Sequence, residues 1–125
     1  MSAWTGEELD KIGTAEELKL SSVRNDGSLR NPVTMWVVRL GDNLYVRSVR
    51  GRSSSWFQGA QTRHEAHILL GGIEKDVELI EIDDVNDELD SAYRTKYSGR
   101  YATIVPSIVS PQAREATLKL VPLSE

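Results

Sequence analysis

The sequence predicts a small antiparallel β-barrel, closed or half-closed, with helices on its flank, which is a mainly β fold of the α+β type. Three observations lead to this prediction. Short stretches rich in β-branched and aromatic residues follow one another, tight turns join them as antiparallel hairpins, and one later stretch has a clear apolar helix face. A chain of 125 residues is expected to form one domain over residues 1–125.

The first expected element is a helix. Thr5 and Glu8 have the spacing of a capping box, in front of a short apolar helix face. Thr14 and Glu17 repeat this spacing, which predicts a second short helical turn. The polar residues 21–31 are expected to form a loop or a bulged hairpin.

Two hairpins are expected in the centre of the chain. Residues 32–39 are apolar, β-branched and aromatic, and a Gly-Asp-Asn turn separates them from a second strand over residues 44–50. Residues 66–70 and 73–82 flank a Gly-Gly pair, which permits the positive φ angles of a tight turn.

The last third is expected to contain the main helix and a closing strand. Asp84 is in position to cap this helix, its apolar face recurs as far as Tyr97, and Gly99 is placed to end it. A Ser-Pro pair at 110–111 opens a short turn, and residues 117–121 alternate like a strand. The expected total is about five strands.

Composition excludes several classes of function. The chain has no cysteine, so disulfides, thiolate metal sites and cysteine nucleophiles are excluded. A net charge of −4 argues against general nucleic-acid binding. No apolar run approaches the ~20 residues of a membrane span, and the first residues do not resemble a signal peptide. We therefore expect a cytoplasmic protein with no nucleic-acid or membrane partner.

Two clusters of basic residues are candidates for anion binding. Arg24 and Arg30 flank a glycine-containing loop, and an arginine fork fits a phosphate. Arg47 and Arg50 lie at the end of a predicted strand, on opposite faces of it. The alternative for both clusters is a charged, solvated surface.

Small and aromatic residues complete the second cluster. Ser48 and Gly51 lie beside its arginines, and the glycine would allow close approach to an anion. Trp36 and Trp56 could stack on a planar ligand. Core packing is the alternative for Trp36, since it lies in an apolar strand, and Trp56 is the better candidate for ligand contact.

The remaining polar clusters give weaker hypotheses. His64 and His67 could bind a metal ion for hydrolysis, but no third ligand has a persuasive spacing. The carboxylates near Asp84 are typical of a capped helix start. No catalytic serine motif, Walker loop or Rossmann fingerprint is present.

The order of these features resembles the flavin- and deazaflavin-binding split β-barrel superfamily, the pyridoxamine-phosphate-oxidase-like proteins. The closest branch is the deazaflavin-dependent nitroreductase type, in which basic residues and a glycine precede a strand, and a second strand ends in serine and glycine before a tryptophan. The opening residues 4–9 also resemble a family of small bacterial proteins of unknown function.

The resemblance implies a split β-barrel that binds FMN or a deazaflavin as a homodimer. Basic residues would hold the cofactor's phosphate, and the ring would lie against the hairpin and an aromatic side chain. Arg50 stands where the family has glycine. The cofactor-binding candidates are Arg24, Arg30, Trp36, Arg47, Ser48, Arg50, Gly51 and Trp56.

The leading hypothesis is therefore a flavin- or deazaflavin-binding oxidoreductase of unknown substrate, with no catalytic residue and no metal site assigned. The cofactor would supply the redox chemistry, which suits a chain with no evident acid–base pair. The alternative is a non-catalytic split barrel that binds a ligand or another protein, because a fold does not fix a function.

Overall fold

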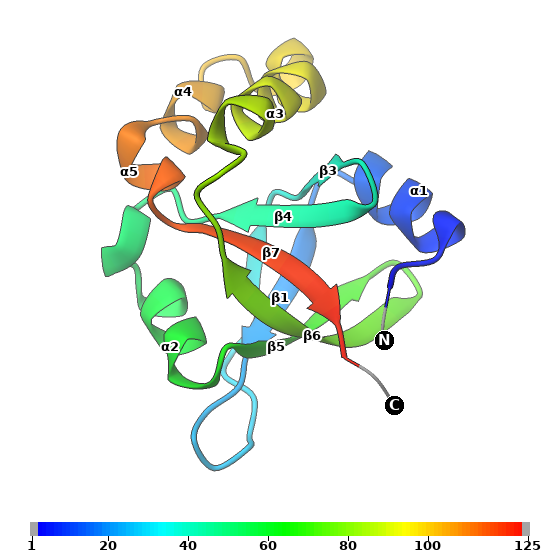
Figure 1. The fold of residues 1–125 in the computed structure, drawn as a ribbon, viewed down its shortest axis with the longest axis vertical. Coiled ribbons are helices and arrows are strands. Elements are labelled where there is room, and N and C mark those ends of the chain that lie inside the picture. The colour runs from blue at the N-terminus through cyan, green and yellow to red at the C-terminus, as the bar shows by residue number, and fades with distance from the viewer. Residues whose placement is uncertain (1–2, 124–125) are drawn as a thin grey trace.

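A seven-stranded antiparallel sheet forms the body of the computed structural model, which describes residues 3–123 (Figure 1). Its strand order is β2-β1-β5-β6-β7-β4-β3. The strands are β1 Leu18–Ser22, β2 Val33–Met35, β3 Val38–Leu40, β4 Asn43–Arg47, β5 Glu65–Leu70, β6 Ile73–Glu81 and β7 Thr117–Pro122.

The sheet is curled into a half-barrel. Strands β2 and β3 lie at opposite edges of the sheet, yet only Trp36 and Val37 separate them in the chain. Consecutive Cα atoms are about 3.8 Å apart, so this short connection holds the two edges close together. The predicted antiparallel split barrel with flanking helices is confirmed.

The predicted single strand over residues 32–39 is two strands. Its first half pairs with β1 and its second half pairs with β4, and the chain crosses between the sheet edges at Trp36. Both halves are apolar and β-branched, so their composition does not reveal the break. The hairpin of β3 with β4 and that of β5 with β6 are as predicted.

Helices lie around the sheet, and α1 and α3 pack against its edge strand β3 (Figure 1). The helices are α1 Gly6–Thr14, the 3₁₀-helix η1 Gly51–Ser53, α2 Ser55–Arg63, α3 Asn86–Tyr101, α4 Val105–Ile108 and α5 Pro111–Arg114. The capping box at the start of α1 is confirmed, since the Glu8 N–H donates to Thr5 Oγ1 at 3.1 Å and the Thr5 N–H to Glu8 Oε1 at 2.9 Å.

The second helical turn predicted after Thr14 is wrong. The Thr14 hydroxyl donates to the Asp10 carbonyl at 2.8 Å, within the last turn of α1, and caps no new helix. The chain becomes extended and enters β1 at Leu18, which is buried with Leu20 while Lys19 between them is exposed. This alternation has the period of a strand.

Helix α3 differs from its prediction at both ends. Its N-cap is Val85 in place of Asp84, and the helix continues past Gly99 to Tyr101. Gly99 lies in open space on the solvent side, so it costs helix propensity without ending the helix. The extension places Tyr101 on the same helix face as Tyr97, one turn later.

Two apolar clusters hold the layers together. The larger one lies inside the curl of the sheet and includes Leu20, Val46 and Ile68. The smaller one joins α3 to β3 and β4 through Tyr93 and Val38. Within residues 3–123, no helix has both the length and the apolar character needed to cross a membrane.

Candidate functional site

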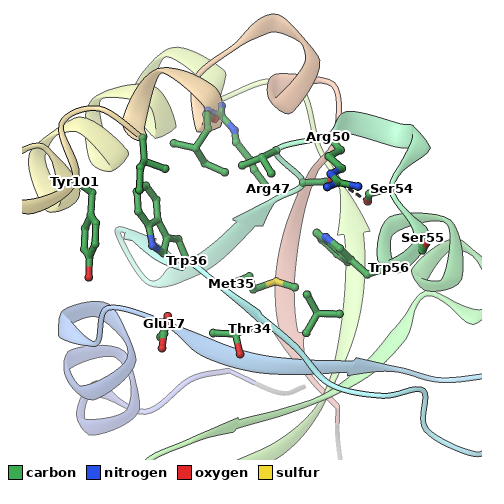
Figure 2. A pocket seen from close by; sticks show the side chains of 15 residues that line it. Glu17, Thr34, Met35, Trp36, Arg47, Arg50, Ser54, Ser55, Trp56 and Tyr101 are labelled. Carbon is green, nitrogen blue, oxygen red and sulfur yellow. Dashed lines mark hydrogen bonds between the residues drawn. The ribbon is translucent and has the colours of Figure 1, made fainter.

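A cavity of about 560 Å³ opens beside the crossing between β2 and β3. This volume lies within the range of roughly 300–1,000 Å³ that small-molecule sites occupy. Figure 2 shows two groups of labelled side chains, with Arg50, Ser54 and Ser55 on one side and Trp36 and Tyr101 on the other. The lining residues are Glu17, Val33, Thr34, Met35, Trp36, Arg47, Ser48, Val49, Arg50, Ser54, Ser55, Trp56, Tyr101, Ile104 and Ile108.

The polar end of the cavity lies at the start of α2. Ser54 is the N-cap, and its hydroxyl accepts from the Phe57 N–H at 3.3 Å. The N–H groups of Ser55 and Trp56 belong to the first turn, so they have no acceptor within the helix. Together with the helix dipole, these groups attract an anion.

Arg50 adds a positive charge to this end. Its side chain is exposed, lines the cavity and makes no hydrogen bond or ion pair within residues 3–123. Its guanidinium therefore has donors available for a ligand, next to the N-terminus of α2. Arg50 and the helix start form a donor set that fits a phosphate group.

Ser48 and Gly51 shape the loop that carries Arg50. The Ser48 hydroxyl donates to Ser54 Oγ at 2.7 Å, so it anchors the N-cap of α2. Gly51 has a φ of 73°, in the left-handed region, and a Cβ there would lie 2.5 Å from the Gln112 Cγ. Only glycine fits this turn without strain.

The guanidinium of Arg47 makes all of its hydrogen bonds inside the protein. Its side chain is 0% exposed and pairs with Asp90 at 2.5 Å. Its Nε donates to Thr117 Oγ1, Nη1 also donates to the Ile108 carbonyl, and Nη2 donates to both oxygens of Asn86. All five N–H groups have acceptors, so none is available for a ligand.

The aromatic end of the cavity is held by α3. Trp36 stacks on Tyr97, with ring centroids 3.9 Å apart and planes within 3°. The Val37 N–H donates to the Tyr97 hydroxyl at 3.2 Å, and Lys96 Nζ donates to the Val37 carbonyl at 2.6 Å. Lys96 and Tyr97 therefore fix the crossing between β2 and β3, and with it the Trp36 ring.

Burial changes the protonation of this clamp. Burial lowers the pKa of Lys96 from 10.5 to about 8, against a smaller opposing effect of Glu16. Burial also raises the pKa of Tyr97 well above its ordinary value of 10.0. The tyrosine therefore remains a neutral hydroxyl, which donates to the Glu16 carbonyl at 2.5 Å.

Arg24 and Arg30 do not line this cavity. Arg24 lies at the tip of the β1–β2 connection, where its Nη1 donates to the Ser28 hydroxyl and the Leu29 carbonyl. Arg30 lies across α2, where its Nε would be 2.7 Å from a Cβ at Gly59. The Nε is buried and has no hydrogen-bond partner among the described residues.

The two histidines lie on different elements. His64 is the C-cap of α2 with a φ of 56°, and His67 lies on β5. His67 bonds Asp76 at 2.8 Å, which raises its pKa together with a contact to Glu74. Within the part of the chain that the structure describes, no group of three or more such side chains could hold a metal ion.

Several lining residues escaped the sequence analysis. Glu17 was expected in a helical turn, and Tyr101 beyond the end of the main helix. Val33 and Met35 carried no polar signal, and Ile104 and Ile108 come from a part of the chain far from the central hairpin. The recurrence of tyrosine at 93, 97 and 101, at helical spacing, is the one signal that could have revealed Tyr101.

Comparison with known families identifies the chain. It belongs to the family described as an uncharacterized protein conserved in bacteria (DUF2255), which matches residues 8–120. This confirms the predicted resemblance to a bacterial family of unknown function. No curated protein matches the sequence.

Solved structures with the same fold are distant in sequence. The conserved hypothetical protein Rv2991 from Mycobacterium tuberculosis aligns with a TM-score of 0.66 and 12% identity, covering 99% of this chain and 82% of that one. HutZ, the heme storage protein from Vibrio cholerae, aligns at 0.63 and 12%, covering 96% and 91%. An FAD-binding protein from Mesorhizobium loti aligns at 0.57 and 14%, covering 98% and 92%.

Other solved structures with this fold include an F420 reductase and an FMN-binding protein from Syntrophomonas wolfei, so several of these neighbours are described by a flavin, F420 or heme. The resemblance to the flavin- and deazaflavin-binding superfamily is therefore confirmed at the level of the fold. At these identities the likeness shows the fold alone, and a function has to be argued from the cavity itself.

Proposed function

We propose that the cavity binds FMN or a deazaflavin, with the phosphate at the Arg50 end and the ring toward the aromatic end. The observation that carries this proposal is the pairing of a free arginine with the start of α2, across one cavity from an apolar and aromatic wall (Figure 2). A ligand with a planar ring and an anionic tail matches both ends.

The proposal gives each residue a role. Arg50, with the N–H groups of Ser55 and Trp56, holds the phosphate, and Ser48 and Gly51 set the loop. Trp56 and Trp36 border the ring. Arg47 positions α3 and α4 and does not touch the ligand. Arg24 and Arg30 hold no part of a ligand confined to this cavity.

The proposed reaction class is oxidation–reduction of a small molecule. A bound flavin or deazaflavin supplies hydride transfer, while the chain binds and orients it and excludes water. A non-catalytic ligand-binding role is the second candidate, favoured by Arg50 standing where the resembling family has glycine. Turnover of the bound cofactor with a reductant and an artificial acceptor distinguishes the two.

The exposed apolar residues at the rim favour a homodimer. Val49 and Ile104 are each 48% exposed and both line the cavity. A second copy covering this rim would shield the ring from water. Light scattering should give twice the mass of the 14.0 kDa chain, and a monomer at micromolar concentration would contradict this part of the proposal.

A titration with FMN and with a deazaflavin, followed by absorbance, tests the proposal. We expect the Arg50→Ala variant to bind about tenfold more weakly, because a charge-assisted hydrogen bond is lost. Arg94→Ala is the matched control, since Arg94 is exposed on α3 and lies outside the cavity. No spectral change with either cofactor would overturn the proposal.

A further inference from the structure

The end of the cavity opposite Arg50 carries a carboxylate. Glu17 lines the cavity together with Trp36 and Tyr101, and Figure 2 shows these three side chains on the same side. The last pair in the register of β1 and β2 joins Leu18 with Met35, and Glu17 and Trp36 each lie one residue beyond this pair.

The charge of Glu17 has no partner within the described chain. Two nearby donors bond the neighbouring Glu16, because its carboxylate accepts from Arg100 at 2.5 Å and from the Tyr101 hydroxyl at 2.8 Å. The Lys96 ammonium group donates its hydrogen bond to the Val37 carbonyl and not to Glu17. Glu17 makes no ion pair or hydrogen bond within residues 3–123, and its carboxylate is exposed.

The aromatic wall beside Glu17 offers a ring face. Trp36 and Tyr101 have centroids 5.3 Å apart and are tilted by 49°. One face of Trp36 is covered by Tyr97, which stacks on it. The protein already places a cation on this cluster, because the Arg100 guanidinium lies 5.6 Å from the Tyr101 centroid. Tryptophan and tyrosine faces attract cations, most strongly when water is excluded.

We propose that this end of the cavity is a subsite for an organic cation, a protonated amine or a quaternary ammonium group, held by the Glu17 carboxylate against Trp36 and Tyr101. A carboxylate beside ring faces matches such a group in both charge and shape. The cation would be the co-substrate of the bound cofactor, and this part of the inference rests on the proposed function. The two charged ends of the cavity then select different ligands, an anion at Arg50 and a cation at Glu17.

Benzyltrimethylammonium is a suitable probe, and benzyl alcohol is an uncharged aromatic control. We expect the wild-type protein to bind the cation more tightly than benzyl alcohol in an NMR titration. Glu17→Gln should weaken the cation about three- to tenfold, a modest loss because Glu17 is exposed. The control Glu78→Gln, an exposed residue of β6 outside the cavity, removes the same charge and should have no effect.

Added salt provides a second readout. It should weaken cation binding to the wild type more than to Glu17→Gln, because screening acts on the carboxylate. The proposal is overturned if the wild type binds no cation, if benzyl alcohol binds as tightly as the cation, or if Glu17→Gln and the wild type bind the cation equally. Titrations with FMN alone separate the two proposals. Binding of the cation without binding of FMN contradicts only the proposed cofactor site. Binding of FMN without binding of the cation contradicts only the cation subsite.

Discussion

Arg47 and Arg50 are separated by two residues at the end of one strand, yet the fold uses them in opposite ways. Arg47 lies inside the protein and bonds residues from β7, α3 and α4. Arg50 is exposed at the cavity. The sequence placed both in one candidate cluster, because nothing in the local pattern shows that Asp90 and Asn86 would reach Arg47 from far along the chain.

Replacing Arg47 should strongly destabilise the protein. Arg47→Met leaves Asp90 with only the partly exposed Arg114, 3.4 Å away, so we expect a loss of about 3 kcal/mol, the low end for a broken buried pair. Urea denaturation measures the free energy of unfolding. Arg52→Met is the control, because Arg52 pairs with Glu81 at the surface and should cost no more than about 1 kcal/mol. Equal losses for the two variants would contradict the role assigned to Arg47.

Lys96 makes stability depend on pH. Its pKa is about 8 in the folded chain and near 10.5 when exposed, so between these values the unfolded chain binds more protons. The free energy of unfolding should therefore rise from pH 8 to pH 10, by about 1 kcal/mol after allowance for the exposed part of the side chain. Above pH 10, ionisation of Tyr97 in the unfolded chain opposes the rise.

Urea denaturation of Lys96→Met across this pH range checks the effect. Methionine has a similar length to lysine but no titratable amine. The free energy of unfolding of the variant should therefore not change between pH 8 and pH 10. A rise in the variant equal to that of the wild type would show that other groups cause it.

At the scale of elements, the turn between β4 and α2 decides whether the polar end of the cavity forms. Gly51→Ala adds a Cβ to a residue with a left-handed backbone conformation and places it against Gln112. This should lower the free energy of unfolding by about 1–2 kcal/mol. Gly99→Ala is the matched control, since a Cβ there meets open space in a helix and should add about 0.5–1 kcal/mol. Thermal denaturation compares them, and a stable Gly51→Ala variant would contradict the account of the turn.

The elements also show how far sequence reasoning extends. Hairpins joined by glycine turns were predicted correctly, because the turn chemistry is local. The division of residues 32–39 was missed, because it arises from pairing with two different sheet edges. The end of α3 was missed because an exposed glycine lowers helix propensity by about 1 kcal/mol, which packing of Tyr93 and Tyr97 offsets.

At the scale of the whole molecule, the crossing at Trp36 links the fold to the cavity. Trp36 and Val37 bring the sheet edges together, and Trp36 forms part of the aromatic wall. Helix α3 holds this crossing through Lys96 and Tyr97. The sequence predicted the part of the candidate site that lies near the central hairpin, where Trp36, Arg50 and Trp56 line the cavity. Its other wall comes from α3 and α4, whose position only the folded chain reveals.

The most direct test of the proposed cofactor site compares ligands with and without a phosphate. FMN should bind the wild-type protein at least about tenfold more tightly than riboflavin, since only FMN carries a phosphate that reaches Arg50 and the start of α2. The same gap is expected between a deazaflavin bearing a phosphate and its dephosphorylated form. Equal affinity within both pairs, or binding of none of the four, would contradict the account.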